Sequence, residues 1–118
     1  MTTFDQADQA GQADQAAREQ PRQEYLVRLR VALPPDMPAE ERTRNYAQQR
    51  ARVDELSELG VIDRLWRLPG QMANVGIWSA PSTTDLHHAL MSLPLWTYMT
   101  IDVEALATHP TVDGRATP

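Results

Sequence analysis

Apolar and polar residues alternate along residues 25–33. Val27, Leu29 and Val31 fall on one side of this alternation, and Arg28 and Arg30 fall on the other. A period of two is typical of a strand with one buried face. Two prolines follow at residues 34 and 35, and proline cannot donate to a sheet ladder. We therefore expect the first strand to end there.

A helical period replaces the alternation between residues 40 and 59. Apolar and amide side chains recur every three or four residues, at Tyr46, Gln49, Val53 and Leu56, and Gly60 supplies a usual helix stop. A second helix is predicted over residues 83–93, where Ser82 and Asp85 form a capping pattern at the start. The chain thus contains two predicted helices.

Two further apolar runs, residues 61–68 and 71–79, flank a Pro-Gly pair at residues 69 and 70. A run, a turn and a second run predict a β-hairpin. Within the second run Asn74 alternates onto the same face as Trp78, which makes Asn74 the first candidate for contact with a ligand. Residues 99–106 alternate again and predict a fourth strand.

The predicted order is strand, helix, strand, strand, helix, strand. This order indicates an α+β, ferredoxin-like βαββαβ fold: a four-stranded antiparallel sheet with both helices on one face. We assign it to residues 24–118 and interpret residues 1–23, which consist mainly of Gln, Ala and Asp, as a disordered or partly helical polar arm. The uncovered sheet face would expose apolar and aromatic residues, so we expect a homo-oligomer.

The composition of the chain excludes several kinds of partner and reaction. A net charge of -5 in 118 residues disfavours a nucleic-acid partner. Cysteine and lysine are absent, which excludes thiolate nucleophiles, thiolate zinc sites and Schiff bases. His87 and His88 are adjacent and would point about 100° apart on a helix, so they do not predict a metal site. No apolar run approaches the roughly 20 residues of a membrane helix, and we expect a soluble, cytoplasmic protein without a membrane partner.

Several short motifs resemble the family of muconolactone delta-isomerase and chloromuconolactone dehalogenase. They are Leu65-Trp66-Arg67-Leu68-Pro69-Gly70, Ala73-Asn74, Leu86-His87 and residues 91–99, within a similarity that covers about residues 25–112. The resemblance implies a cofactor-independent enzyme of aromatic catabolism with a ferredoxin-like fold, assembled from dimers up to a decamer. It also implies a small-molecule substrate, a carboxymethyl butenolide on which a proton moves through a dienolate.

The resemblance also suggests site residues. The family would place a proton-shuttling Glu where this chain has Gln49 and a Tyr where it has Met72. A carboxamide cannot accept the proton, and a thioether cannot donate as a phenol does. The candidate catalytic residues are Gln49, Asn74 and His87, and the candidate substrate-binding residues are Trp66, Met72, Arg28, Tyr46, Trp96 and Tyr98. We expect no metal and no cofactor.

These departures leave three functions open. The first is an isomerase of small unsaturated lactones. The second is a cyclase or isomerase of a biosynthetic pathway that has reused the same pocket. The third is a non-catalytic oligomeric binding protein.

Overall fold

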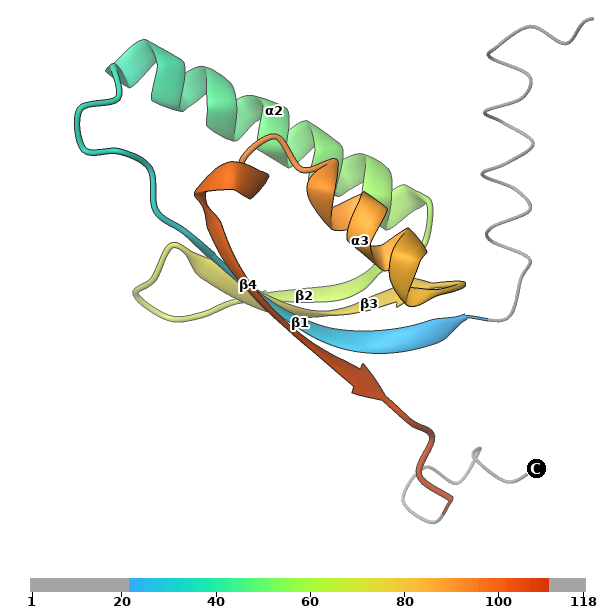
Figure 1. The fold of residues 1–118 in the computed structure, drawn as a ribbon. Helices are drawn as coiled ribbons and strands as arrows, with labels where there is room; N and C mark the ends of the chain where they lie inside the picture. The colour runs from blue at the N-terminus through green and yellow to red at the C-terminus, as the bar shows by residue number, and fades with distance from the viewer. Residues whose placement is uncertain (1–21, 111–118) are drawn as a thin grey trace, which may run out of the picture.

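The computed structural model describes residues 22–110, so most of the predicted arm, residues 1–23, lies outside the described residues (Figure 1). The elements, in chain order, are β1 (Gln23–Val31), α2 (Ala39–Glu58), β2 (Ile62–Arg67), β3 (Ala73–Ala80), α3 (Thr83–Met91), the short 3-10 helix η1 (Trp96–Tyr98) and β4 (Met99–Leu106). The predicted fourth strand is confirmed at both ends. The first strand begins at Gln23 rather than Tyr25 and ends at Val31 rather than Leu33.

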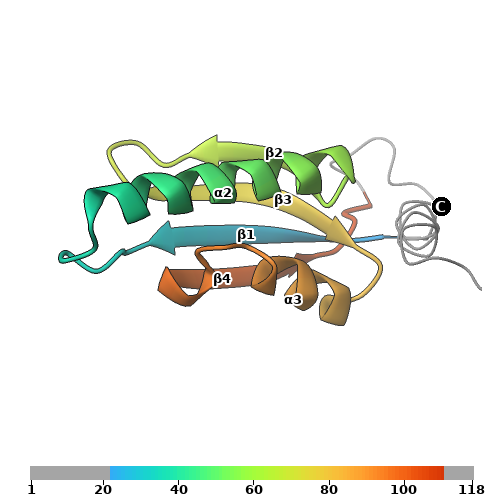
Figure 2. The ribbon, with the colours of Figure 1, turned by 90° about the horizontal axis from the view of Figure 1, so that it is seen from above.

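The four strands form one antiparallel sheet in the order β2-β3-β1-β4. Both helices lie on the same face of this sheet, with α2 over the β2 and β3 side and α3 over the β1 and β4 side (Figures 1 and 2). The predicted ferredoxin-like fold is confirmed.

The register assigns each residue of the central strands to a face. Tyr25, Val27 and Leu29 of β1 are buried beneath the helices and stand opposite Trp78, Gly76 and Asn74 of β3. Directly opposed residues share a face of the sheet. Asn74 therefore lies on the helix-covered face, as the alternation predicts.

The core occupies only one end of this covered face. It is formed by Trp78, Tyr25, Leu56 of α2, and Leu86 and Leu90 of α3. Helix α2 has 20 residues and α3 has 9, which correspond to lengths of about 30 Å and about 14 Å. The short helix lies beside the C-terminal half of α2 (Figure 2), and the N-terminal half extends beyond it.

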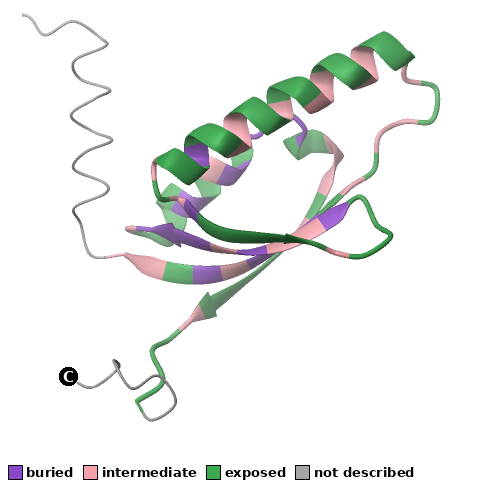
Figure 3. Ribbon diagram, turned by 180° about the vertical axis from the view of Figure 1, so that it is seen from behind, coloured by how far each residue is buried: buried purple, intermediate pink, exposed green. Residues whose placement is uncertain are grey.

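Burial follows the same division. Exposed residues run along the outer side of α2, and buried residues gather on the sheet and α3 (Figure 3). Leu56 is the one buried residue of α2, whereas Tyr46, Gln49 and Val53 on the same stripe are half-buried. The space beneath the middle of α2 is therefore incompletely filled.

The end of α2 and the start of α3 follow from the sequence. Gly60, at φ 78°, ends α2: its N–H donates to the Ser57 carbonyl, and the Val61 N–H donates to the Leu56 carbonyl. This pair of bonds is a Schellman motif, which needs a left-handed residue. At the start of α3 the Ser82 hydroxyl accepts from the Asp85 N–H at 3.1 Å, which confirms the predicted cap.

Candidate functional site

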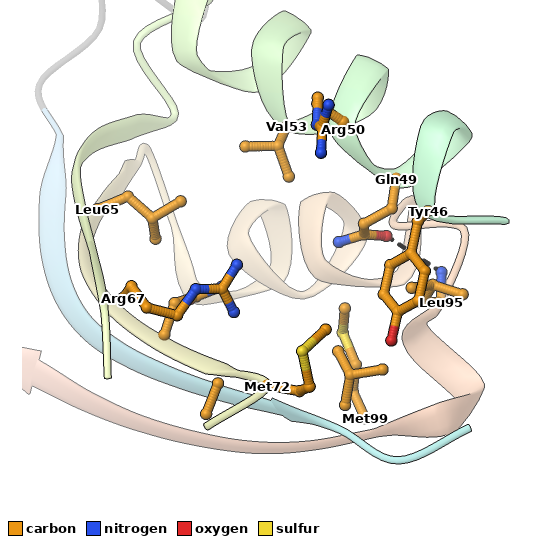
Figure 4. Close-up of a pocket in the computed structure, with 12 residues that line it drawn as sticks. Tyr46, Gln49, Arg50, Val53, Leu65, Arg67, Met72, Leu95 and Met99 are labelled. Atoms are coloured by element: carbon orange, nitrogen blue, oxygen red, sulfur yellow. Dashed lines mark hydrogen bonds between the residues drawn. The ribbon is translucent and has the colours of Figure 1, made fainter. Parts of the chain in front are cut away.

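A cavity of about 330 Å³ lies between the middle of α2 and the sheet (Figure 4). Every strand contributes to its walls. The lining residues are Val31, Tyr46, Gln49, Arg50, Val53, Leu65, Arg67, Met72, Ala73, Asn74, Leu95 and Met99. The part of the covered face that α3 leaves open thus forms a pocket large enough for a small molecule.

Gln49 has a defined orientation at the roof of the cavity. Its Oε1 accepts a hydrogen bond from the Leu95 N–H at 3.2 Å. The opposite end of the carboxamide, Nε2, points into the cavity (Figure 4). Because an amide nitrogen only donates, Gln49 presents donors to whatever occupies this space.

A β-bulge determines which residues of β2 face the cavity. Ile62 stands opposite Trp78 and Arg64 stands opposite Ile77, so two residues of β2 oppose one of β3. A bulge of this kind reverses the alternation beyond it. Leu65 and Arg67 consequently point to the covered face, and Arg67 stands opposite Asn74.

Asn74 lies on the floor of the cavity. Its Oδ1 is buried and has no hydrogen-bond partner within residues 22–110. An unpaired buried acceptor costs about 1–3 kcal/mol. This cost, at a residue that lines a cavity, is typical of a side chain retained for ligand contact.

The cavity is positively charged. Arg50 and Arg67 line it, and among the described lining residues there is no carboxylate and no histidine. Arg67 Nη1 lies 3.5 Å from the Gln71 carbonyl oxygen, and its side chain extends from β2 toward the space under α2 (Figure 4). Guanidinium groups bind carboxylates well because they donate along two parallel directions. The charge and shape suit a small anionic ligand.

Four of the residues proposed from the sequence meet in this cavity: Tyr46, Gln49, Met72 and Asn74. The structure does not bring Trp66 and Arg28 there. Trp66 stands opposite Val75, which stands opposite Arg28, and all three lie on the uncovered face. For Trp66 the bulge is the reason; its ring instead contacts Arg64, whose Cζ lies 4.7 Å from the ring centroid.

The remaining three candidates also lie outside the cavity. His87 is exposed on α3, because it follows the buried Leu86 on a helix that packs on the core end of the sheet. Its ring meets Trp96 edge to face, with centroids 6.4 Å apart. Tyr98 is half-buried in η1, and its carbonyl accepts from the Ala32 N–H at 2.9 Å.

Sequence reasoning did not select the two arginines of the cavity. Arg50 follows Gln49 directly and lies one turn beyond Tyr46, so helical spacing from Tyr46 could have found it. Arg67 could not be found from the sequence, because simple alternation from Ile62 places it on the uncovered face of the sheet. The face on which Arg67 lies follows only from the bulge in β2, which the structure shows.

Within residues 22–110 no group of three or more His, Asp or Glu side chains could hold a metal ion. None of the helices in that range is long and apolar enough to cross a membrane.

Comparison with known proteins identifies the family. The family model described as muconolactone delta-isomerase matches residues 23–112. The chain belongs to this family. Muconolactone Delta-isomerase of Cupriavidus pinatubonensis is 42% identical over 86 residues, which are 73% of this chain and 94% of that protein. Muconolactone Delta-isomerase 2 of Acinetobacter lwoffii is 39% identical over 85 residues, 72% of this chain and 88% of that protein.

A solved member of the family has the same fold. A crystal structure of muconolactone isomerase superposes with a TM-score of 0.72 at 36% identity, covering 76% of this chain and 94% of that one. Nearly all of each relative thus aligns with this chain. Homology to muconolactone delta-isomerases supports an isomerase-like function for the domain.

Proposed function

We propose that this protein is a cofactor-independent isomerase that moves a proton on a small unsaturated lactone bearing a carboxylate, through a dienolate. Family membership supports the reaction class. The observation that carries the substrate class is the cavity beneath α2, which combines Arg50 and Arg67 with the amide donors of Gln49.

The proposed chemistry gives roles to three side chains of the cavity. Arg67 and Arg50 hold the substrate carboxylate, and the Gln49 Nε2–H donates to the lactone carbonyl oxygen. Removal of a proton from the ring carbon that bears the side chain breaks that C–H bond, and its electron pair delocalises onto the carbonyl oxygen as a dienolate. Delivery of a solvent-exchangeable proton to the carbon beside the carbonyl completes the isomerisation. Donors aimed at the developing oxyanion lower the barrier.

Assembly and location form part of the same proposal. We expect a cytoplasmic homo-oligomer built from dimers, up to a decamer. Apolar side chains on the uncovered sheet face support association between copies: Trp66 is 43% exposed, and Leu26, Val75 and Ile77 are half-buried on that face.

The direct test is incubation with muconolactone in D₂O, followed by NMR. The proposal expects enol-lactone product with deuterium at the carbon beside the carbonyl, or exchange into recovered substrate. An enzyme that yields neither product nor exchange at high protein concentration would contradict the proposal.

A second candidate is a cyclase or isomerase of a biosynthetic pathway. It is favoured by the absence of a carboxylate among the described lining residues and by the thioethers of Met72 and Met99, which suit a larger apolar substrate. The double variant Gln49→Glu with Met72→Tyr tests it. Muconolactone turnover that appears only in this variant would support divergence, whereas full turnover by the unmodified protein would exclude it.

A further inference from the structure

Among the described residues that line the cavity, a single side chain is able to exchange a proton. Carboxamides, thioethers and aliphatic groups form most of its described lining, and its two arginines stay protonated in proteins. Tyr46 is the exception, because a phenol can lose and regain its proton. Among the described residues that line this cavity, only Tyr46 is therefore available for proton transfer.

The position of Tyr46 suits that use. It is half-buried on α2, one turn before Gln49 and Arg50. Its ring points from the helix toward the sheet, with the hydroxyl directed to the side where Met72 and Met99 lie (Figure 4). Within the described residues this hydroxyl makes no hydrogen bond, so it can contact a ligand without breaking an existing one.

His87 is the other group that could carry a proton, and its surroundings argue against it. It is exposed on α3, does not line the cavity, and its ring lies against Trp96. A general acid or base must reach the reacting atom directly or through one water. Tyr46 meets this requirement for a substrate in the cavity, and His87 does not.

We propose that Tyr46 is the catalytic acid/base of this protein, an inference that rests on the proposed isomerase function. In its phenolate form the oxygen takes the proton from the ring carbon: the C–H bond breaks, an O–H bond forms, and the electron pair enters the dienolate. The phenol then delivers a proton to the carbon beside the carbonyl, which restores the phenolate. Because a phenolic O–H exchanges with solvent, the proton delivered in D₂O is a deuteron. No oxidant, reductant or second substrate is required. The cations Arg50 and Arg67, which hold the substrate carboxylate, also lower the electrostatic cost of the negative charge that passes between phenolate and dienolate in the same cavity.

The first experiment compares Tyr46→Phe with the unmodified enzyme, using muconolactone in D₂O. We expect kcat to fall by about 100-fold or more, the usual contribution of general acid–base catalysis, while KM changes much less. Tyr25→Phe is the matched control: it removes a hydroxyl that bonds to Thr83 Oγ1 at 2.9 Å in the core, outside the cavity. The control should keep full deuterium exchange.

A second variant separates a catalytic role from a structural one. Gln49→Glu places a carboxylate in the cavity one turn from residue 46, so adding it to Tyr46→Phe should restore exchange at least 10-fold. A merely structural loss at residue 46 would not be rescued this way.

The outcomes distinguish the two proposals. If the unmodified enzyme exchanges deuterium and Tyr46→Phe retains that rate, Tyr46 is not the acid/base and the isomerase function stands. If the unmodified enzyme neither exchanges nor isomerises muconolactone, the proposed function fails and this inference fails with it.

Discussion

Gln49 is the residue on which the site depends most. Its carboxamide links two segments far apart in the sequence, because Oε1 accepts from the Leu95 N–H while Nε2 faces the cavity. One side chain thus supports the loop before η1 and presents donors to a ligand. Sequence spacing alone predicted that Gln49 lies on the helix face toward the sheet, and the structure adds the partner.

Gln49→Leu should destabilise the protein by about 1–3 kcal/mol, because it leaves the Leu95 N–H without its acceptor. Gln49→Glu keeps an oxygen at that position and should cost clearly less. Urea unfolding of both variants measures the difference. Equal stability of the two variants would show that the bond to Leu95 contributes little.

Arg67 should anchor the substrate carboxylate. Arg67→Gln should raise KM for muconolactone by about 10- to 100-fold, since one charge-assisted hydrogen bond contributes roughly 1.5–3 kcal/mol. Arg64→Gln is the matched control, because Arg64 is exposed on the uncovered face of the same strand. Equal effects of the two substitutions on KM would mean that bulk charge, rather than a contact in the cavity, attracts the substrate.

At the scale of elements, the bulge between Ile62 and Arg64 acts together with Gly76, which stands opposite the next residue of β2, Leu65. A Cβ added to Gly76 would lie 2.5 Å from the Arg64 carbonyl oxygen and 2.8 Å from Leu65 Cδ1. Only glycine lets β2 approach β3 this closely. The close approach holds Leu65 and Arg67 toward the cavity.

Gly76→Ala should therefore destabilise the protein by about 1–3 kcal/mol, the usual cost of overpacking, and weaken lactone binding. Thermal unfolding and a ligand titration measure the two effects. Val75→Ala, one residue earlier on the uncovered face, should leave binding unchanged. Wild-type stability and binding in Gly76→Ala would contradict the role of the close approach.

The sequence predicts the elements well and the site only in part. Apolar patterning and turn residues predicted the four strands and the two α-helices but not the short 3-10 helix η1, and the shared face of Asn74 and Trp78 is confirmed. The faces of the sheet on which Arg67 and Trp66 lie depend on a one-residue bulge, and no alternation pattern reveals its position. Arg28 was different: its own alternation already placed it opposite the buried face, and hence away from a cavity under the helices.

At the scale of the molecule, the uncovered sheet face combines apolar and charged residues. Leu26, Val75, Ile77 and Trp66 share it with Arg28 of β1. It also carries acidic Asp102 and Glu104 on β4, opposite Arg28 and Leu26. Apolar residues flanked by both charges are typical of a surface that pairs with a second copy.

Ile77→Asp should lower the oligomeric state, because it places a charge among these apolar side chains. Analytical ultracentrifugation measures the change, with Gln48→Asp at an exposed position of α2 as the control. Dissociation by Gln48→Asp but not by Ile77→Asp would place the interface on the helical side instead.

The most direct test of the account is a crystal structure with carboxymethyl tetronic acid, a stable lactone enolate that resembles the proposed dienolate. We expect the ligand beneath α2, with its carboxylate within hydrogen-bond distance of Arg67 or Arg50 and its enolate oxygen near Gln49 Nε2 and the Tyr46 hydroxyl. Crystals in which this compound binds elsewhere and leaves the space under α2 empty would contradict the assignment of the site.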